Sequence, residues 1–423
     1  MKVSQIVLLG SAATALTSSL LGFAEFARGE VLLSTTGRAT YDSRVFGGLN
    51  PADDYIFTLE PRLIYRREAG LLKLDSHAGL RVNRYEEFQE LDSEDFFTSV
   101  RLSLPPGTGT VASGSFETSY DERTDVNYDV NARMREKTFH SRLNTLFPTG
   151  LKTSVSVGGS YRKEDRAHFN DREIWEGTAA FRYTDFLGGS TFEARYRRLD
   201  VESTGLNFLG VPLDQKSDIY SVSLSRPIYH DVRGSISYGY RVLHRSRAEV
   251  AGMSNRAAGS IIAVNIEGPF LPATRFPKLE SSLSFGYQEA ETPGIADTGG
   301  SRFFGAARLG WHARERTQVY IQARRALELS IEDLTIETTS GEIGVSQSVG
   351  NFTHLSASIG YEERDYRTLT RQDEAFTAHV GANYRITQAW SAAANYRLRA
   401  TDSSSTSADY DRHVVWISAT YTF

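Results

Sequence analysis

The sequence of 423 residues contains no Cys and only three Met and eleven Pro. The absence of Cys excludes a disulfide framework, a Cys-ligated zinc site, an iron–sulfur cluster and a thiol nucleophile. Lysine is also scarce, since seven of the 47 basic residues are Lys and the others are Arg. The formal net charge is −5 and no long basic segment occurs, so the charge pattern gives no indication of nucleic-acid binding.

Long apolar runs are absent beyond the N-terminus, which excludes transmembrane helices there because such a helix needs about 18 or more apolar residues. Apolar residues make up 40% of the chain and the mean hydropathy is −0.36, which is low for a long chain that buries a large core in water. A membrane around the protein would instead accommodate apolar side chains on its outer surface.

Residues 1–24 have the features of a secretory signal peptide. Lys2 precedes an apolar stretch over residues 6–21, and Gly22 and Ala24 place small residues at positions −3 and −1 of a signal-peptidase site. We expect cleavage after Ala24, with Ala27 as the second choice. An exported protein without transmembrane helices is periplasmic, secreted or an outer-membrane β-barrel.

Apolar and polar residues alternate with a period of two over residues 31–423, which predicts strands with one apolar and one polar face. In the last segment Val415, Ile417 and Ala419 share one face, and Ser418 and Thr420 lie on the other. Along the chain the polar face is rich in Ser, Gly, Thr, Asn and Arg, whereas a sheet in contact with solvent would carry more Lys and Glu. This composition favours a crowded aqueous interior.

The connections between the predicted strands alternate between short turns (68–71, 105–109, 149–151, 187–189, 230–232, 314–317, 350–352 and 387–389) and longer acidic loops (43–54, 88–95, 124–131, 203–218, 292–300 and 401–409). Short periplasmic turns and longer extracellular loops are typical of outer-membrane barrels. The pattern predicts an all-β, antiparallel, up-and-down transmembrane barrel of about 20 strands over residues 31–423, with 18 strands as the alternative and both chain ends in the periplasm. Sandwiches and propellers fit poorly, because no crossover or repeated blade motif occurs.

Aromatic residues flank the predicted strands, as in the girdles of membrane barrels. We expect Tyr41, Tyr55, Tyr85, Tyr120, Tyr161, Tyr240, Tyr287 and Tyr361 near the outer rim and Phe147, Phe186, Phe270 and Trp390 near the inner rim. The chain ends at Phe423, with Tyr421 on the same face. This ending resembles the C-terminal signal by which the barrel-assembly machinery recognises bacterial outer-membrane proteins.

No catalytic motif is apparent. The nine His are scattered and none lies in an HExxH motif. Adjacent carboxylates such as Glu362 and Glu363 point to opposite faces of a strand and make poor acid–base pairs. We therefore expect no enzymatic activity, no catalytic residue, no metal site and no cofactor.

The polar face is the candidate functional site, because it carries many Arg side chains. The alternation places Arg62, Arg81, Arg101, Arg182, Arg195, Arg197, Arg241, Arg308, Arg324, Arg385, Arg397 and Arg399 on the lumen side, with fewer acids, among them Glu60, Asp75, Glu117, Glu193, Glu267, Glu280, Glu328 and Glu342. Rings of Arg select anions in pores, whereas Arg–Glu ladders would only brace the wall. A barrel of this size is wide, so inward Arg, folded-in loops or a partner should fill it.

Over residues 41–88 the sequence resembles the putative β-barrel porin type 2 family, outer-membrane proteins often associated with exopolysaccharide gene clusters. The residues that carry the resemblance are Tyr41, Asp42, Val45, Phe46, Asp53, Asp54, Pro61 and Tyr85, while Arg44 replaces the usual Asn. The resemblance implies a porin or a role in export of surface polysaccharide, and it supplies no catalytic residues.

We therefore expect a barrel in the outer membrane of a Gram-negative bacterium that passes hydrophilic, anionic material, linked first to exopolysaccharide export. A small-solute diffusion porin is one alternative, and a structural or surface-interaction barrel with a closed lumen is the other. The expected partners are outer-membrane lipid, lipopolysaccharide, the barrel-assembly machinery and polysaccharide export components, with no nucleic acid.

Overall fold

A computed structural model describes residues 29–48, 50–68, 71–106, 111–130, 132–167, 171–203, 214–229, 231–245, 256–269, 278–289, 302–329, 335–366, 371–405 and 408–423. The predicted signal peptide therefore lies outside the described residues. Within these ranges no helix is long and apolar enough to cross a membrane.

Twenty strands make up the fold. Their bounds are β1 Glu30–Asp42, β2 Asp54–Arg67, β3 Lys73–Tyr85, β4 Ser93–Leu104, β5 Ser113–Asn127, β6 Ala132–Pro148, β7 Thr153–Arg166, β8 Arg172–Phe186, β9 Ser190–Ser203, β10 Gln215–Tyr229, β11 Val232–Arg245, β12 Arg256–Glu267, β13 Leu279–Gln288, β14 Arg302–Arg314, β15 Thr317–Leu329, β16 Thr335–Val349, β17 Thr353–Tyr366, β18 Arg371–Arg385, β19 Trp390–Ser403 and β20 Tyr410–Thr422. One 3-10 turn, η3, covers Gln89–Leu91.

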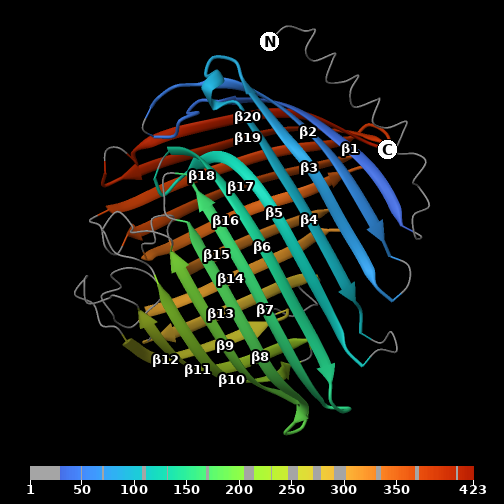
Figure 1. The fold of residues 1–423 in the computed structure, drawn as a ribbon, viewed down its shortest axis with the longest axis vertical. Coiled ribbons are helices and arrows are strands. Elements are labelled where there is room, and N and C mark those ends of the chain that lie inside the picture. The colour runs from blue at the N-terminus through green and yellow to red at the C-terminus, as the bar shows by residue number, and fades with distance from the viewer. Residues whose placement is uncertain are drawn as a thin grey trace.

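The strands form one closed antiparallel sheet in which each strand pairs with the next along the chain. The first and last strands close the ring, because β1 pairs with β20 from Ser34 opposite Thr422 to Asp42 opposite Val414. Leu33 and Phe423 exchange two backbone hydrogen bonds of 2.8 and 2.9 Å at this seam. Front and back walls of the barrel cross at a large angle in Figure 1, as the strand tilt of a barrel requires. The predicted barrel and its strand number are confirmed.

The two ends of the barrel differ. One end, here called the turn end, holds the start of β1, the end of β20 and the turns after the even-numbered strands. The other, the loop end, holds the connections after the odd-numbered strands. Short turns are typical of the periplasmic end of outer-membrane barrels, so the turn end is the end that the sequence predicts to be periplasmic. The loop predicted over residues 124–131 is wrong in extent, since β5 runs to Asn127 and β6 starts at Ala132. Asp125 in this stretch pairs with Arg123 and Arg412.

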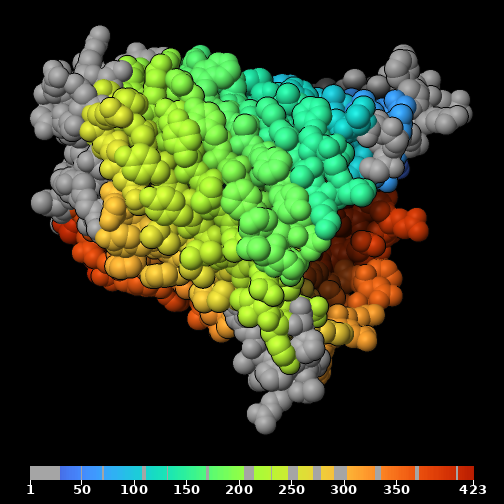
Figure 2. Space-filling model, turned by 90° about the horizontal axis from the view of Figure 1, so that it is seen from below, coloured from blue at the N-terminus to red at the C-terminus, as the bar shows by residue number. Residues whose placement is uncertain are grey.

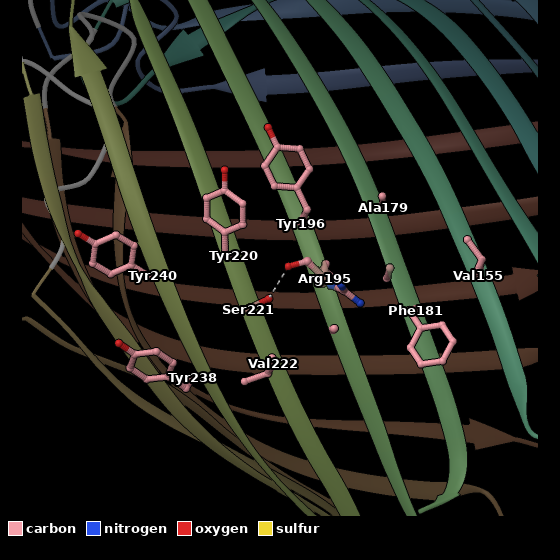
Figure 3. Close-up of a pocket in the computed structure, with 12 residues that line it drawn as sticks. Val155, Ala179, Phe181, Arg195, Tyr196, Tyr220, Ser221, Val222, Tyr238 and Tyr240 are labelled. Atoms are coloured by element: carbon pink, nitrogen blue, oxygen red, sulfur yellow. Dashed lines mark hydrogen bonds between the residues drawn. The ribbon is translucent and has the colours of Figure 1, made fainter.

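The outer face of the barrel is apolar. Ile417, Val380 and Phe181 are exposed there. In Figure 2 the green, yellow and orange strands form a continuous wall, and a hollow on the right lies between the green strands and the orange and red ones. Figure 3 shows Tyr196, Tyr220 and other rings on the viewer's side of their strands, with the opposite wall behind them. Lipid would cover this surface, since a water-exposed apolar face of this extent is unfavourable.

Aromatic pairs lie near both rims of the outer face, as predicted. Ring centroids of Tyr41 and Tyr55 are 5.3 Å apart near the loop end, and those of Trp390 and Tyr421 are 4.7 Å apart near the turn end. Tyr85 is a correction, because it pairs with inward-facing Ile56 and is buried inside the barrel. Its position at a strand end suggested the girdle, but its place in the alternation puts it on the other face. Phe270 lies outside the described residues.

Candidate functional site

Contacts across the barrel identify the inner face. Arg364 of β17 donates a 3.0 Å hydrogen bond to Asp129 in the connection between β5 and β6, and the Arg399 guanidinium of β19 lies 4.4 Å from the centre of the Tyr128 ring. Strands β5 and β6 are far from β17 and β19 around the ring, so these contacts must cross the interior. The face that carries Arg364 and Arg399 is therefore the inner face.

The pairing register places all twelve predicted Arg residues on this face. On the adjacent strands Arg195 lies beside Ala180 and Ser221, and Arg399 lies beside Thr377 and Arg412. The twelve residues are spread over β2, β3, β4, β8, β9, β11, β14, β15, β18 and β19, so they do not form one cluster. They line the wall at different heights between the two ends.

Eight of these Arg residues form ion pairs with carboxylates, namely Arg62, Arg81, Arg101, Arg182, Arg195, Arg197, Arg324 and Arg399. Three of these carboxylates are each shared by two Arg residues, and one of them is Glu362, which pairs with Arg364 and Arg399. Glu60 accepts from Arg62 at 2.7 Å and from Arg81 at 3.1 Å, and Glu193 accepts from Arg182 at 2.7 Å and from Arg195 at 2.6 Å. The group at Glu193 therefore has two positive charges and one negative charge, whereas beside the group at Glu60 a second acid, Asp95, lies directly opposite Arg81.

Inward aromatic rings support two of the other four guanidinium groups. Arg308 lies over the Tyr320 ring at 5.9 Å and Arg397 over the Trp416 ring at 5.6 Å, within the range of cation–π attraction. Arg385 is exposed near the turn end, and Arg241 lies in one row with Arg197, with Ile219 between them.

Glycines allow inward rings to lie flat against the wall. Phe97 is directly opposite Gly79, Phe304 opposite Gly286, and Tyr320 opposite Gly344. A Cβ atom on any of the three glycines would collide with the ring of its partner. A flat ring takes up little of the lumen, so these pairs keep the interior wide where larger side chains would narrow it.

A buried ionic cluster lies at the loop end where the barrel closes. Asp42 of β1 accepts hydrogen bonds from Arg412 at 3.0 and 2.7 Å and from Arg133 of β6 at 3.2 Å. Arg133 also donates to the Tyr85 hydroxyl at 2.8 Å, and Arg412 lies 3.5 Å from Asp125. The cluster therefore connects the β1–β20 seam to the β5–β6 hairpin.

The tip of that hairpin, residues 128–130, reaches the opposite wall. Besides the Arg364 contact, the backbone oxygen of Asp129 accepts a 2.6 Å hydrogen bond from Arg371 of β18. In Figure 1 the teal connection after β5 lies beside the β17–β18 end of the barrel. We call residues 128–130 the β5–β6 tip. It extends over part of the loop-end mouth, and so a folded-in segment does fill part of the interior.

The sequence did not indicate these cross-barrel groups or the inward rings. Asp42 was noted only for the family resemblance, and Tyr85 was expected in the outer aromatic girdle. The inward aromatic residues could have been found by applying the alternation to every strand. Phe97, Tyr320 and Trp416 each lie four residues from an inward Arg on the same strand, and residues an even number apart on a strand share one face. The partners of Asp129 could not have been found in this way.

The predicted assembly residues lie on the outer face at the turn end. Tyr421 packs between Trp390 and Phe423, with ring centroids 4.7 and 5.1 Å away. Their recognition by an assembly machinery stays a prediction. Among the described residues no group of three or more His, Asp or Glu side chains could hold a metal ion.

Comparison with known families gives a match over the C-terminal part of the barrel. Residues 275–423 match the family described as putative beta-barrel porin 2. This protein is an outer-membrane β-barrel with a porin-like fold. The family predicted from residues 41–88 is thus the one found, although the match falls on β13–β20 instead. The location is the Gram-negative outer membrane. No curated protein sequence matches the chain.

Solved structures with the same fold include siderophore receptors. PirA from Acinetobacter baumannii has 7% identity and a TM-score of 0.54, covering 93% of this chain and 80% of that one. Fiu from E. coli K12, a ferric-catecholate import receptor, has 8% identity and a TM-score of 0.50, covering 92% and 81%. At such low identity the similarity establishes the barrel fold of this porin-like protein and no more.

Proposed function

We propose that the barrel is a diffusion channel that passes hydrophilic solutes and prefers anions. The observation that carries the proposal is the shared pairing of inward Arg residues, two to one carboxylate at Glu60 and again at Glu193. A ladder that only braced the wall would need one acid for each Arg. Positive charge on a pore wall attracts anions and repels cations, and a guanidinium group also binds carboxylate or phosphate with two parallel hydrogen bonds.

A barrel with a closed lumen is the second candidate, and the β5–β6 tip is the observation that favours it. The tip and the Asp42 cluster obstruct one side of the loop-end mouth through several short hydrogen bonds. Export of exopolysaccharide stays a prediction from the family resemblance, since neither the wall nor the similar structures bear on it. A long polymer would have to pass the β5–β6 tip.

Ion selectivity tests the channel proposal. The variant R195Q/R324Q/R397Q removes three exposed inward charges, and it should move the reversal potential in a salt gradient towards zero. Gln keeps a polar side chain and removes only the charge and part of the length. R198Q is the matched control, because Arg198 neighbours Arg197 on β9 but lies on the outer face. An unchanged reversal potential in the triple variant would refute the role of the inward Arg residues.

A further inference from the structure

The inner wall has a polar recess between β13 and β18 with a volume of about 480 Å³. Its lining includes Arg308, Gln322, Arg324, Glu342 and Thr377. This recess differs from the groove in Figure 3, which lies on the outer face and is lined by Tyr, Phe, Val and Ala side chains. Binding sites for small solutes are concave and present a few well-placed polar groups, and the recess meets both conditions.

The strand register sets the layout of this recess. One row across the wall reads Arg308, Gln322, Glu342, Gly360 and Thr377, each directly opposite the next on the neighbouring strand. The next row brings Arg324 opposite Ser340. Gly360 has no side chain of its own, and Thr377 fills the space beside it, since its Oγ1 atom would lie 2.8 Å from a Cβ atom on Gly360. Arg308 and Arg324 thus lie on the β14–β15 side of the recess, Glu342 lies at its centre on β16, and Glu362 and Thr377 lie on the β17–β18 side.

Hydrogen bonds hold the centre of the recess in place. Glu342 accepts from the Gln322 amide at 2.7 Å and from the Tyr320 hydroxyl at 2.6 Å. The Tyr320 ring lies flat against Gly344 and supports Arg308. Preorganised side chains reduce the entropy lost on binding. Gln322 therefore presents its amide oxygen, and Glu342 its carboxylate, in a fixed arrangement towards the lumen.

The two Arg side chains remain accessible to solutes. The Arg324 side chain is 61% exposed, and its partner Glu328 lies four residues further along the same strand, 2.9 Å away. Arg308 is exposed as well and contacts a ring face instead of a carboxylate. A solute carboxylate could bind both groups without first displacing a buried ion pair.

We infer that this recess binds a sugar acid, with its carboxylate on Arg308 and Arg324 and its hydroxyl groups on Gln322, Glu342 and Thr377. A simple carboxylate would bind only the two guanidinium groups, and a neutral sugar would bind only Gln322, Glu342 and Thr377. The inference deepens the proposed function and depends on it for its biological meaning, because a sugar acid bound halfway along the lumen would be a transported solute.

Equilibrium dialysis of the refolded full-length protein in detergent tests the inference, with D-galacturonate, acetate and galactose as the three probes. The wild-type barrel should bind galacturonate more tightly than acetate or galactose. R308Q/R324Q should raise the dissociation constant for galacturonate at least about tenfold, which corresponds to about 1.4 kcal/mol. R182Q/R195Q removes the same charge from another part of the wall and should leave that constant within about twofold. Heat-modifiable migration on a gel verifies that each variant has folded.

Three results would overturn the inference. These are no binding of galacturonate to the wild-type barrel, equal binding of acetate and galacturonate, or equal weakening by the two double variants. Each of them leaves the channel proposal in place if the barrel still conducts anions. If galacturonate binds as expected but no current flows, the recess is a binding site and the channel proposal fails.

Discussion

Asp42 is the residue on which the loop-end cluster depends, and D42N is therefore the most informative stability variant. Its carboxylate is 1% exposed and binds two Arg side chains that are themselves 6% and 8% exposed. Asn has the same shape but no charge. The substitution leaves the Arg133 and Arg412 guanidinium groups buried without the carboxylate that compensates them.

The expected cost follows from burial. Removing one partner of a buried ion pair costs about 3–5 kcal/mol, because the remaining charge stays desolvated. Asp125 lies 3.5 Å from Arg412 and still compensates part of its charge, so the lower end of this range applies. An exposed ion pair contributes only about 0–1 kcal/mol. Asp75 provides this comparison on the same inner face, since it pairs with Arg66 at 3.2 Å and its side chain is 54% exposed.

Urea titration of the folded barrel in detergent micelles or lipid vesicles, followed by Trp fluorescence, measures the difference. D42N should lower the free energy of unfolding by about 3 kcal/mol, and D75N by less than about 1 kcal/mol. Equal effects of the two substitutions would refute the argument, because they would mean that the loop-end cluster is as hydrated as the exposed pair.

Three further predictions concern the faces and the tip. I417R should cost about 2–4 kcal/mol in lipid-based folding assays while S418R is tolerated, and equal costs would mean that the assigned faces are wrong. D129A should enlarge the single-channel conductance because the β5–β6 tip loses its Arg364 contact, whereas D185A at the turn end should leave the conductance unchanged. An unchanged conductance of D129A would show that the tip does not restrict the pore. G79A should destabilise the barrel by about 1–3 kcal/mol, since its Cβ would meet the Phe97 ring and lie 2.7 Å from the Pro61 oxygen. G177A is the control, because a Cβ atom there has no neighbour within 4 Å, and equal stability of the two variants would contradict the prediction.

Much of the barrel could be predicted from the sequence because its determinants are local. Alternation in β19 and β20 assigns Ala394 and Ile417 to one face and Asn395 and Ser418 to the other without knowledge of any partner strand. The lengths of the connections give the strand number and the two ends. The inward Arg residues follow from the same period of two.

The loop end could not be predicted, because its contacts join residues that are distant in sequence. Arg364 and Asp129 are 235 residues apart, and Arg412 and Asp42 are 370 residues apart. Polar residues such as Asp125 indicate a solvated loop when read alone, whereas in the barrel they meet charged groups from the other wall. The position predicted for Tyr85 was wrong for a different reason, since the alternation already puts it on the inner face, where it packs with Val45 and Ile56.

The central claim is that the barrel is an open channel whose inner wall favours anions. Single-channel recording of the refolded protein in a planar bilayer with a salt gradient tests it most directly, because one experiment gives both the conductance and the sign of the reversal potential. A stable conductance with a reversal potential of the anion-selective sign is the predicted result. A folded barrel that conducts no current, or one that prefers cations, would contradict the account.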